Sequence, residues 1–153
     1  MVKLRPMTDV EFEAFERISM EDYAKERARN LDTSVEEQRA EAARQYAELL
    51  KDGLNTTGHH LWKITQEAGE AVGDLWVHVA PGGKRAFIFA ISVDENQRGK
   101  GYGKQALDAL EAELKPLGVT RIGLNVFADN AVAQHLYEKQ GYRVTNYNMV
   151  KQI

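Results

Sequence analysis

Residues 91–104 read Ile-Ser-Val-Asp-Glu-Asn-Gln-Arg-Gly-Lys-Gly-Tyr-Gly-Lys, an apolar strand pattern that runs into a glycine-rich loop and at once into a helix. Glycines at 99, 101 and 103 let the backbone turn sharply and let a ligand approach, because they carry no Cβ. The free N–H groups and the dipole of the following first helical turn favour an anion. Arg98, Lys100 and Lys104 add positive charge. The stretch therefore predicts a cradle for a phosphate or diphosphate.

Three loop patterns that bind phosphates can be compared with this stretch. A P-loop needs Gly-Lys-Ser/Thr at the helix start, but Gly103-Lys104-Gln105 lacks the hydroxyl that binds the metal. The dinucleotide fingerprint needs G-x-G-x-x-G in an early βαβ unit, whereas the spacing here is G-x-G-x-G and lies late in the chain. The third pattern, Arg/Gln-x-x-Gly-x-Gly/Ala, is present at 98–103. A plain glycine-rich turn with solvated basic side chains is the alternative.

Helix and strand signals alternate on both sides of the loop. We expect strands at Val2–Arg5, His60–Gln66, Ala71–Val79, Arg85–Val93, Arg121–Phe127 and Tyr142–Lys151, and helices at about 9–30, 35–50, 104–115 and 130–139. The short turns at Gly69 and at 81–83 make the middle strands an antiparallel meander. The alternation of strand and helix after residue 85 implies a βαβ-like half. The fold class is therefore a mixed α/β domain with about six or seven strands and four helices.

Composition limits the class of protein. With 153 residues and 43% hydrophobic side chains, the chain is long enough for one domain spanning 1–153. The net charge of −3 argues against nucleic-acid binding. The absence of cysteine excludes disulfides, Cys-ligated zinc and a thiol nucleophile. No apolar run is long enough for a signal peptide or a membrane span, so we expect a cytoplasmic protein with no membrane partner.

A second motif follows about 25 residues after the loop. An apolar strand leads into Asn130-x-x-Ala133-x-x-x-Tyr137, and the helix stops at Gly141-Tyr142. Asn130 and Tyr137 are seven residues apart, so they project from one side of a helix, two turns apart. One side chain can hold the amide portion of a cofactor while the other reaches its reactive end. The simpler alternatives are a helix N-cap for Asn130 and a core aromatic for Tyr137.

The two motifs together, over residues 87–142, resemble the GNAT superfamily of N-acetyltransferases, whose coenzyme A pyrophosphate loop has the first pattern. The resemblance implies a GNAT-like single domain whose mostly antiparallel mixed sheet is splayed at the cofactor cleft. It implies acetyl-CoA as co-substrate and no metal. The cofactor contacts it implies are backbone groups of Ile91 and Val93 and the side chain of Asn130 on the pantetheine arm, Arg98 shaping the loop, and the N–H groups of Gly99, Lys100, Gly101, Tyr102, Gly103 and Lys104 on the diphosphate.

The implied reaction is direct attack of an amine on the acetyl group in a ternary complex, with Tyr137 as general acid. The general base is less clear, because Arg85–Val93 carries no carboxylate where many relatives have one. His78, on the same strand face as Trp76, is a candidate base because neutral imidazole accepts a proton at pH 7. A half-buried histidine packed on the sheet and a proton relay through water remain the alternatives.

The two N-terminal helices bear on the acceptor. Residues 8–52 carry 13 acidic and 7 basic side chains, which would attract a cationic amine if these helices overhang the acceptor site. A small-molecule or peptide amine is expected, and a peptide N-terminus, lysine, polyamine or aminoglycoside all stay open, as does a homodimer. Two other classes compete with the enzyme: a non-catalytic acyl-CoA-binding sensor, and a nucleotide or NAD-binding domain that uses the glycine loop alone.

Overall fold

The computed structural model describes all 153 residues and contains one five-stranded sheet in the order β1-β2-β3-β4-β5. The strands are β1 (Lys3–Pro6), β2 (His59–Thr65), β3 (Ala71–Val79), β4 (Arg85–Val93) and β5 (Arg121–Leu124); the helices are α1 (Asp9–Leu31), α2 (Val35–Leu49), α3 (Tyr102–Leu114) and α4 (Ala131–Lys139), with short 3₁₀ turns at Gly53–Asn55, Glu95–Gln97 and Lys115–Leu117. All neighbouring strands are antiparallel except β4 and β5, which are parallel. The mixed, mostly antiparallel sheet expected from the sequence is confirmed.

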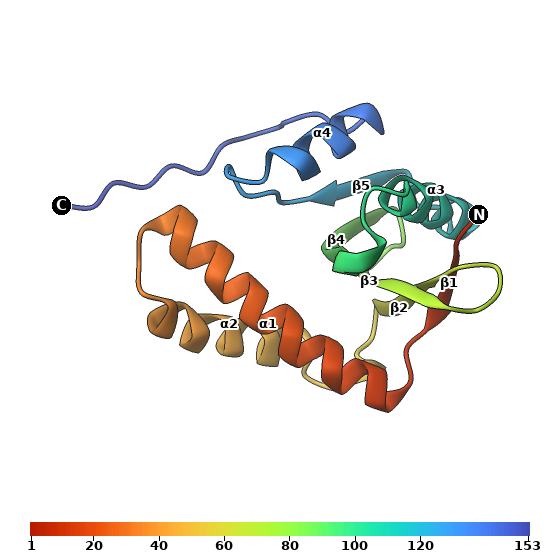
Figure 1. Cartoon of the computed structure of the whole chain (residues 1–153), viewed down its shortest axis with the longest axis horizontal. Coiled ribbons are helices and arrows are strands. Elements are labelled where there is room, and N and C mark those ends of the chain that lie inside the picture. Colours follow the sequence, from red (N-terminus) through yellow and green to blue (C-terminus); the bar gives the residue numbers. More distant parts are fainter.

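Helices α1 and α2 lie against one face of the sheet (Figure 1). A capping box between Thr8 and Glu11 starts α1, and the Ser34 hydroxyl caps α2. Phe12 and Phe15 from α1 and Tyr46 from α2 pack with Trp76 of β3 in one apolar cluster. This cluster fixes the two acidic helices over β3 and β4.

Helix α3 covers the opposite face. Its buried stripe is Ala106, Leu107, Leu110 and Leu114, as the spacing of the apolar residues predicts. These side chains join Ile64, Leu75 and Val77 of the sheet in the larger core cluster, and each buried Leu contributes roughly 1.5–3 kcal/mol to stability. Helix α4 contributes no fully buried residue; Leu136 and Tyr137 pack partly buried against this cluster. Helices α3 and α4 therefore anchor the loop and the second motif on one side of the sheet.

The C-terminal third departs from the expected strands. The sheet has five strands where the sequence analysis expects six or seven, and β5 ends at Leu124 where a strand to Phe127 is expected. The expected strand Tyr142–Lys151 is wrong for the single chain: these residues are extended but pair with no other strand. Figure 1 shows this segment leaving α4 as an arm that runs past the end of α1. A strand needs a neighbouring strand to hydrogen-bond with, and the arm has none in its own chain.

None of the helices is both long enough and apolar enough to cross a lipid bilayer.

Candidate active site

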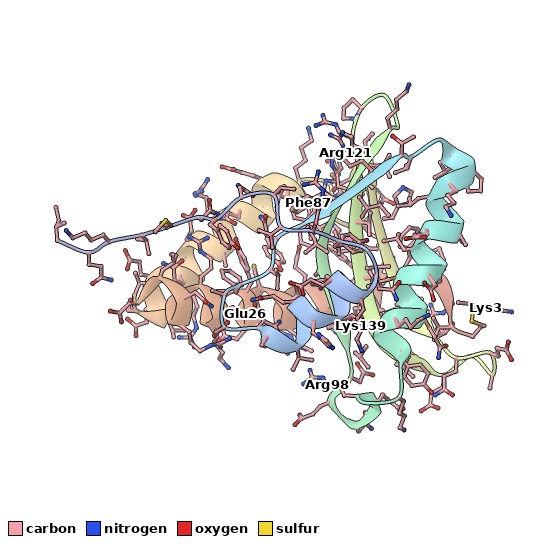
Figure 2. The ribbon with its side chains drawn as sticks, turned by 90° about the horizontal axis from the view of Figure 1, so that it is seen from above. Lys3, Glu26, Phe87, Arg98, Arg121 and Lys139 are labelled. Carbon is pink, nitrogen blue, oxygen red and sulfur yellow. The ribbon has the colours of Figure 1, made fainter.

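Strands β4 and β5 separate along their length. They pair from Arg85 opposite Arg121 to Ile88 opposite Leu124, and β5 then ends while β4 continues to Val93. Backbone groups of Phe89–Val93 that face the β5 side therefore have no strand partner. Figure 2 places Phe87 and Arg121 at the paired end of the two strands and Arg98 at the open end. The splayed sheet that the resemblance implies is present.

A cavity of about 1720 Å³ opens at this separation. Its walls come from β4, β5, α1, α4 and the C-terminal arm, and Ile91, Asn130 and Tyr137 all line it. Val93 does not line the cavity, because its carbonyl accepts a hydrogen bond of 3.0 Å from Arg98 Nε. The structure thus brings Ile91, Asn130 and Tyr137 to one cavity. The Val93 carbonyl is instead hydrogen-bonded to Arg98.

The glycine loop ends in a helix start that has no cap. Gly99 and Gly101 have φ values of +78° and +84°, in the left-handed region that favours glycine, and Gly101 is the N-cap of α3. Its missing side chain leaves the first N–H groups of α3 without a protein partner. A Cβ on Gly99 would meet nothing within 4 Å, so its exposed surface is open to a ligand. The loop has the free donors and the open approach that a diphosphate requires.

Gly103 has a different structural reason from the other two loop glycines. A Cβ at this position would lie 3.1 Å from Leu136 Cδ2 of α4, which is a closer contact than carbon atoms normally make. Glycine here lets the start of α3 pack against α4. The two basic side chains of the loop are exposed: Lys100 Nζ donates to Gln97 Oε1 at 3.1 Å, and Lys104 Nζ pairs with Asp108 Oδ2 at 3.0 Å.

Helix α4 places Asn130 and Tyr137 as the second motif predicts. Asn130 is the N-cap, and its Oδ1 accepts a hydrogen bond of 3.1 Å from the backbone N–H of Ala133. This leaves the two N–H donors of the side-chain amide free. The Tyr137 ring packs edge-on against Tyr142, with centroids 5.8 Å apart. Burial, assisted by the negative charge of Glu26, raises the pKa of Tyr137 to about 12, so the phenol is protonated at neutral pH.

The opposite wall of the cavity is acidic and comes from α1. Asp22 and Glu26 are one helical turn apart and line the cavity with Tyr23 and with Tyr46 of α2. Burial raises the pKa of Glu26, and the neighbouring carboxylates of Asp129 and Asp22 add to the increase while Arg29 opposes it. Figure 2 shows Glu26 on α1 alongside α4.

Sequence reasoning missed Glu26. The sequence feature that could have indicated Glu26 is its i, i+4 spacing from Asp22, with the aromatic residue Tyr23 between them, in a segment that is acidic overall. A second cavity-lining carboxylate, that of Asp74 on β3, is already paired: Lys63 Nζ lies 2.5 Å from it. Arg29 is likewise paired, with Asp129 at 3.0 Å. Among the carboxylates that line the cavity, Glu26 is the one whose charge contributes to the raised pKa of Tyr137.

His78 lies elsewhere. Its ring packs on that of His59, with centroids 4.4 Å apart, and it lines a separate cavity of about 280 Å³ with Arg85 and Arg121. That cavity is at the paired end of β4 and β5, away from the glycine loop. The structure does not bring His78 together with Tyr137. The structure also has no group of three or more His, Asp or Glu side chains arranged to hold a metal ion.

Strands β4 and β5 thus separate next to the glycine loop, and Tyr137 lines the cavity at the gap. The model of the acetyltransferase (GNAT) family matches residues 19–142. The chain belongs to the acetyltransferase (GNAT) family.

Two proteins of Bacillus subtilis are similar over nearly the whole chain. The uncharacterized N-acetyltransferase YdgE is 36% identical over 98% of this chain and 97% of its own. The uncharacterized N-acetyltransferase YycN is 34% identical over 99% of both chains, and its crystal structure superposes with a TM-score of 0.95 over 100% of this chain and 99% of its own. The N-acetyltransferase class expected from the sequence is confirmed.

A more distant solved structure shares the fold. AAC(6')-Iy, in complex with the bisubstrate analog CoA-S-monomethyl-acetylneamine, has a TM-score of 0.61 and 15% identity, covering 100% of this chain and 98% of its own. At this identity the likeness concerns the fold alone.

Proposed function

We propose that this protein transfers the acetyl group of acetyl-CoA to an amine by direct attack in a ternary complex. One observation carries the proposal: the uncapped start of α3 packs on α4 at Gly103 and Leu136, and α4 carries Tyr137 at the cavity where β4 and β5 separate. The free donors, the positive φ angles at 99 and 101 and the adjoining cavity all fit a long ligand with a diphosphate near its middle. Bound there, acetyl-CoA supplies the acetyl group as a thioester.

The loop and β4 hold the donor. The N–H groups of residues 99–104 donate to the diphosphate, and Arg98 fixes the loop through its bond to the Val93 carbonyl. Unpaired backbone groups near Ile91 continue the sheet by bonding the pantetheine amides. Asn130 caps α4 with its oxygen and offers its amide N–H groups to the same arm.

Tyr137 supplies a proton to the departing thiolate. Its pKa of about 12 keeps the proton on the phenol throughout the neutral range, so the hydroxyl can donate a hydrogen bond to the sulfur as the C–S bond breaks. Because a thiol with a pKa near 8.5 is the stronger acid, the proton moves to the sulfur together with the loss of a proton from the attacking nitrogen, which restores the phenol. Backbone N–H groups on the free side of β4 stabilise the negative charge that develops on the acetyl oxygen.

The acceptor is a cationic amine held against α1. Asp22 and Glu26 attract the ammonium, and Glu26 takes its proton because a half-buried carboxylate with a raised pKa is a stronger base than an exposed one. Tyr23 and Tyr46 add aromatic surface to this wall, and Arg27 lies over the Tyr23 ring at 5.7 Å, so the two carboxylates are the groups that attract an amine on a small molecule or a peptide. His78 lies beside the smaller cavity and takes no part in this scheme.

The test is amine-dependent release of free thiol from acetyl-CoA, measured on the wild type and on Tyr137→Phe. The variant should lose about 10- to 100-fold in kcat while its KM for acetyl-CoA changes less than about threefold. Tyr142→Phe is the matched control, since the pKa of this neighbouring tyrosine is also about 12 and it loses the same hydroxyl.

The competing classes can be distinguished when melting temperatures are measured beside the thiol-release assay. A coenzyme A-dependent rise in melting temperature without thiol release for any amine would indicate a sensor, and an equal rise with NAD or ATP would indicate a general nucleotide site. Full activity of Tyr137→Phe would remove the general-acid role.

A further inference from the structure

The segment Arg143–Ile153, called here the C-terminal arm, has the character of a strand but no sheet. Every residue in it is exposed, and none of its backbone N–H groups donates a hydrogen bond. Tyr147 is 82% exposed and Met149 is 95% exposed. The arm also exposes Val144, Val150 and Ile153, residue types that favour strands. A surface this apolar on an extended backbone indicates that the arm binds to something.

The same chain has a sheet edge that lacks a strand. β5 is the last strand of the sheet, and its outer side presents unpaired backbone donors and acceptors. Val126, just beyond β5, and Val132, on α4, are exposed apolar side chains. The large cavity lies beside this edge, and the chain's own arm lines it from Arg143 to Val150 without pairing with β5. The edge needs a strand, and the arm is longer than the four residues of β5.

Arm and edge do not meet within one chain. The far end of the arm is held at the end of α1, where Gln152 Nε2 donates to the carbonyls of Leu31, at 3.2 Å, and Asp32. Figure 1 shows the arm crossing from α4 to that point, away from β5. The arm thus lies along the cavity between α4 and the end of α1, with its backbone donors and acceptors free to pair elsewhere.

We propose that two copies of this chain exchange their C-terminal arms, each arm adding a strand along the β5 edge of the other copy. A two-fold exchange satisfies both edges at once, because each copy has one arm to give and one edge to fill. The exchanged arm buries Val144, Tyr147 and Val150 and takes the place of the partner's own arm along the wall of the partner's cavity. The active site of each copy is then completed by residues of the other.

The first test is oligomeric state, which does not depend on whether the protein transfers acetyl groups. Sedimentation should give a dimer of twice 17.3 kDa for the wild type. Asn148→Pro removes a backbone N–H and bars strand pairing, so it should weaken dimerisation at least tenfold. Asn148→Ser keeps the N–H and should leave the dimer intact. The proposal would be overturned if the wild type stayed monomeric at 100 times the protein concentration used in the activity assay. It would also be overturned if the Asn148→Pro variant dimerised like the wild type.

The second test locates the arm and uses the absence of natural cysteine. Val126→Cys is combined in turn with Val144→Cys, Tyr147→Cys and Val150→Cys, and each double variant is oxidised at low concentration. Exchange predicts a covalent dimer in at least one combination, and none when Val10→Cys on α1 replaces Val126→Cys. A disulfide within one chain would show that the arm folds back on its own copy. That result, or no cross-link in any combination, would refute the exchange.

Discussion

The diphosphate cradle can be tested by placing a negative charge at the N-cap of α3. Gly101→Asp introduces a carboxylate where the structure has open space, since the nearest atom to a Cβ there is Gln105 Nε2 at 3.9 Å. The positive φ of +84° costs about 1–2 kcal/mol of stability for any non-glycine residue. In the free protein this cost is partly offset, because Asp is a favourable N-cap and interacts well with the helix dipole.

The same carboxylate should oppose a bound diphosphate. Two phosphate charges about 5 Å away repel it by roughly 1.7 kcal/mol in water, and by about twice that at an effective dielectric constant near 40. The dissociation constant for coenzyme A should therefore rise about 20- to 300-fold, as measured by titration calorimetry. The increase should shrink as salt is added, because the repulsion is screened.

Two control variants separate charge from backbone strain. Gly101→Ala carries the same strain without the charge, so its affinity should lie much closer to that of the wild type. Gly118→Asp also places an aspartate at a glycine with positive φ and open space, but at the other end of α3, and it should bind coenzyme A normally. If Gly101→Asp binds no worse than Gly101→Ala, the loop does not hold the diphosphate.

Three further substitutions test other parts of the molecule. Glu26→Gln should lower kcat and raise the KM for a cationic amine without changing coenzyme A affinity, because it removes both the base and the negative charge. It should also raise the melting temperature at pH 7 but not below pH 4, because a folded-state pKa raised by burial costs stability as pH increases through it. The pKa of His59 is lowered to about 4, mainly by burial, and its Nδ1 accepts from Trp76 Nε1 at 2.8 Å; stability should therefore fall as pH drops from about 6.5 to 4, and less so in His59→Gln, as measured by melting scans. Asp74→Ala should cost about 1–3 kcal/mol in denaturant unfolding, because it leaves Lys63 largely buried without its partner, and Lys63→Met in the same chain should recover part of that loss.

Local sequence pattern was sufficient for the parts of the site that are local in the chain. Arg85–Val93 is an apolar segment bounded by the turn at 81–83 and the glycine loop, and its expected bounds match β4. The glycines at 99 and 101 have the left-handed backbone that a tight anion loop requires. The two alternatives for the second motif are also partly right: Asn130 does cap α4, and Tyr137 does pack against the core. Neither alternative conflicts with the proposed roles, since Asn130 retains its amide donors and Tyr137 lines the cavity.

What the sequence could not provide depends on contacts between distant segments. Gly103 belongs to the loop pattern, but its need for glycine comes from Leu136 of α4, whose position no local pattern specifies. Glu26 becomes a candidate base only because α1 lies across the cavity from Tyr137. Residues 142–151 have a strand pattern, yet a strand also requires an edge, and the pattern says nothing about which edge is within reach.

The donor and acceptor sides of the site are held together by contacts of very different strength. On the donor side, Arg98 joins the loop to the end of β4, and Gly103 lets α3 pack directly on α4, so the loop and Tyr137 are fixed relative to each other. On the acceptor side, α1 meets the segment before α4 through exposed polar contacts of Arg29 and Asn30 with Asp129 and through one pair of rings, Tyr23 and Phe127, whose centroids are 6.2 Å apart. Exposed ion pairs of this kind contribute only about 0.2–1 kcal/mol. The acidic wall can therefore move to admit an amine while the donor geometry stays constant, which is the arrangement that a direct transfer in a ternary complex requires.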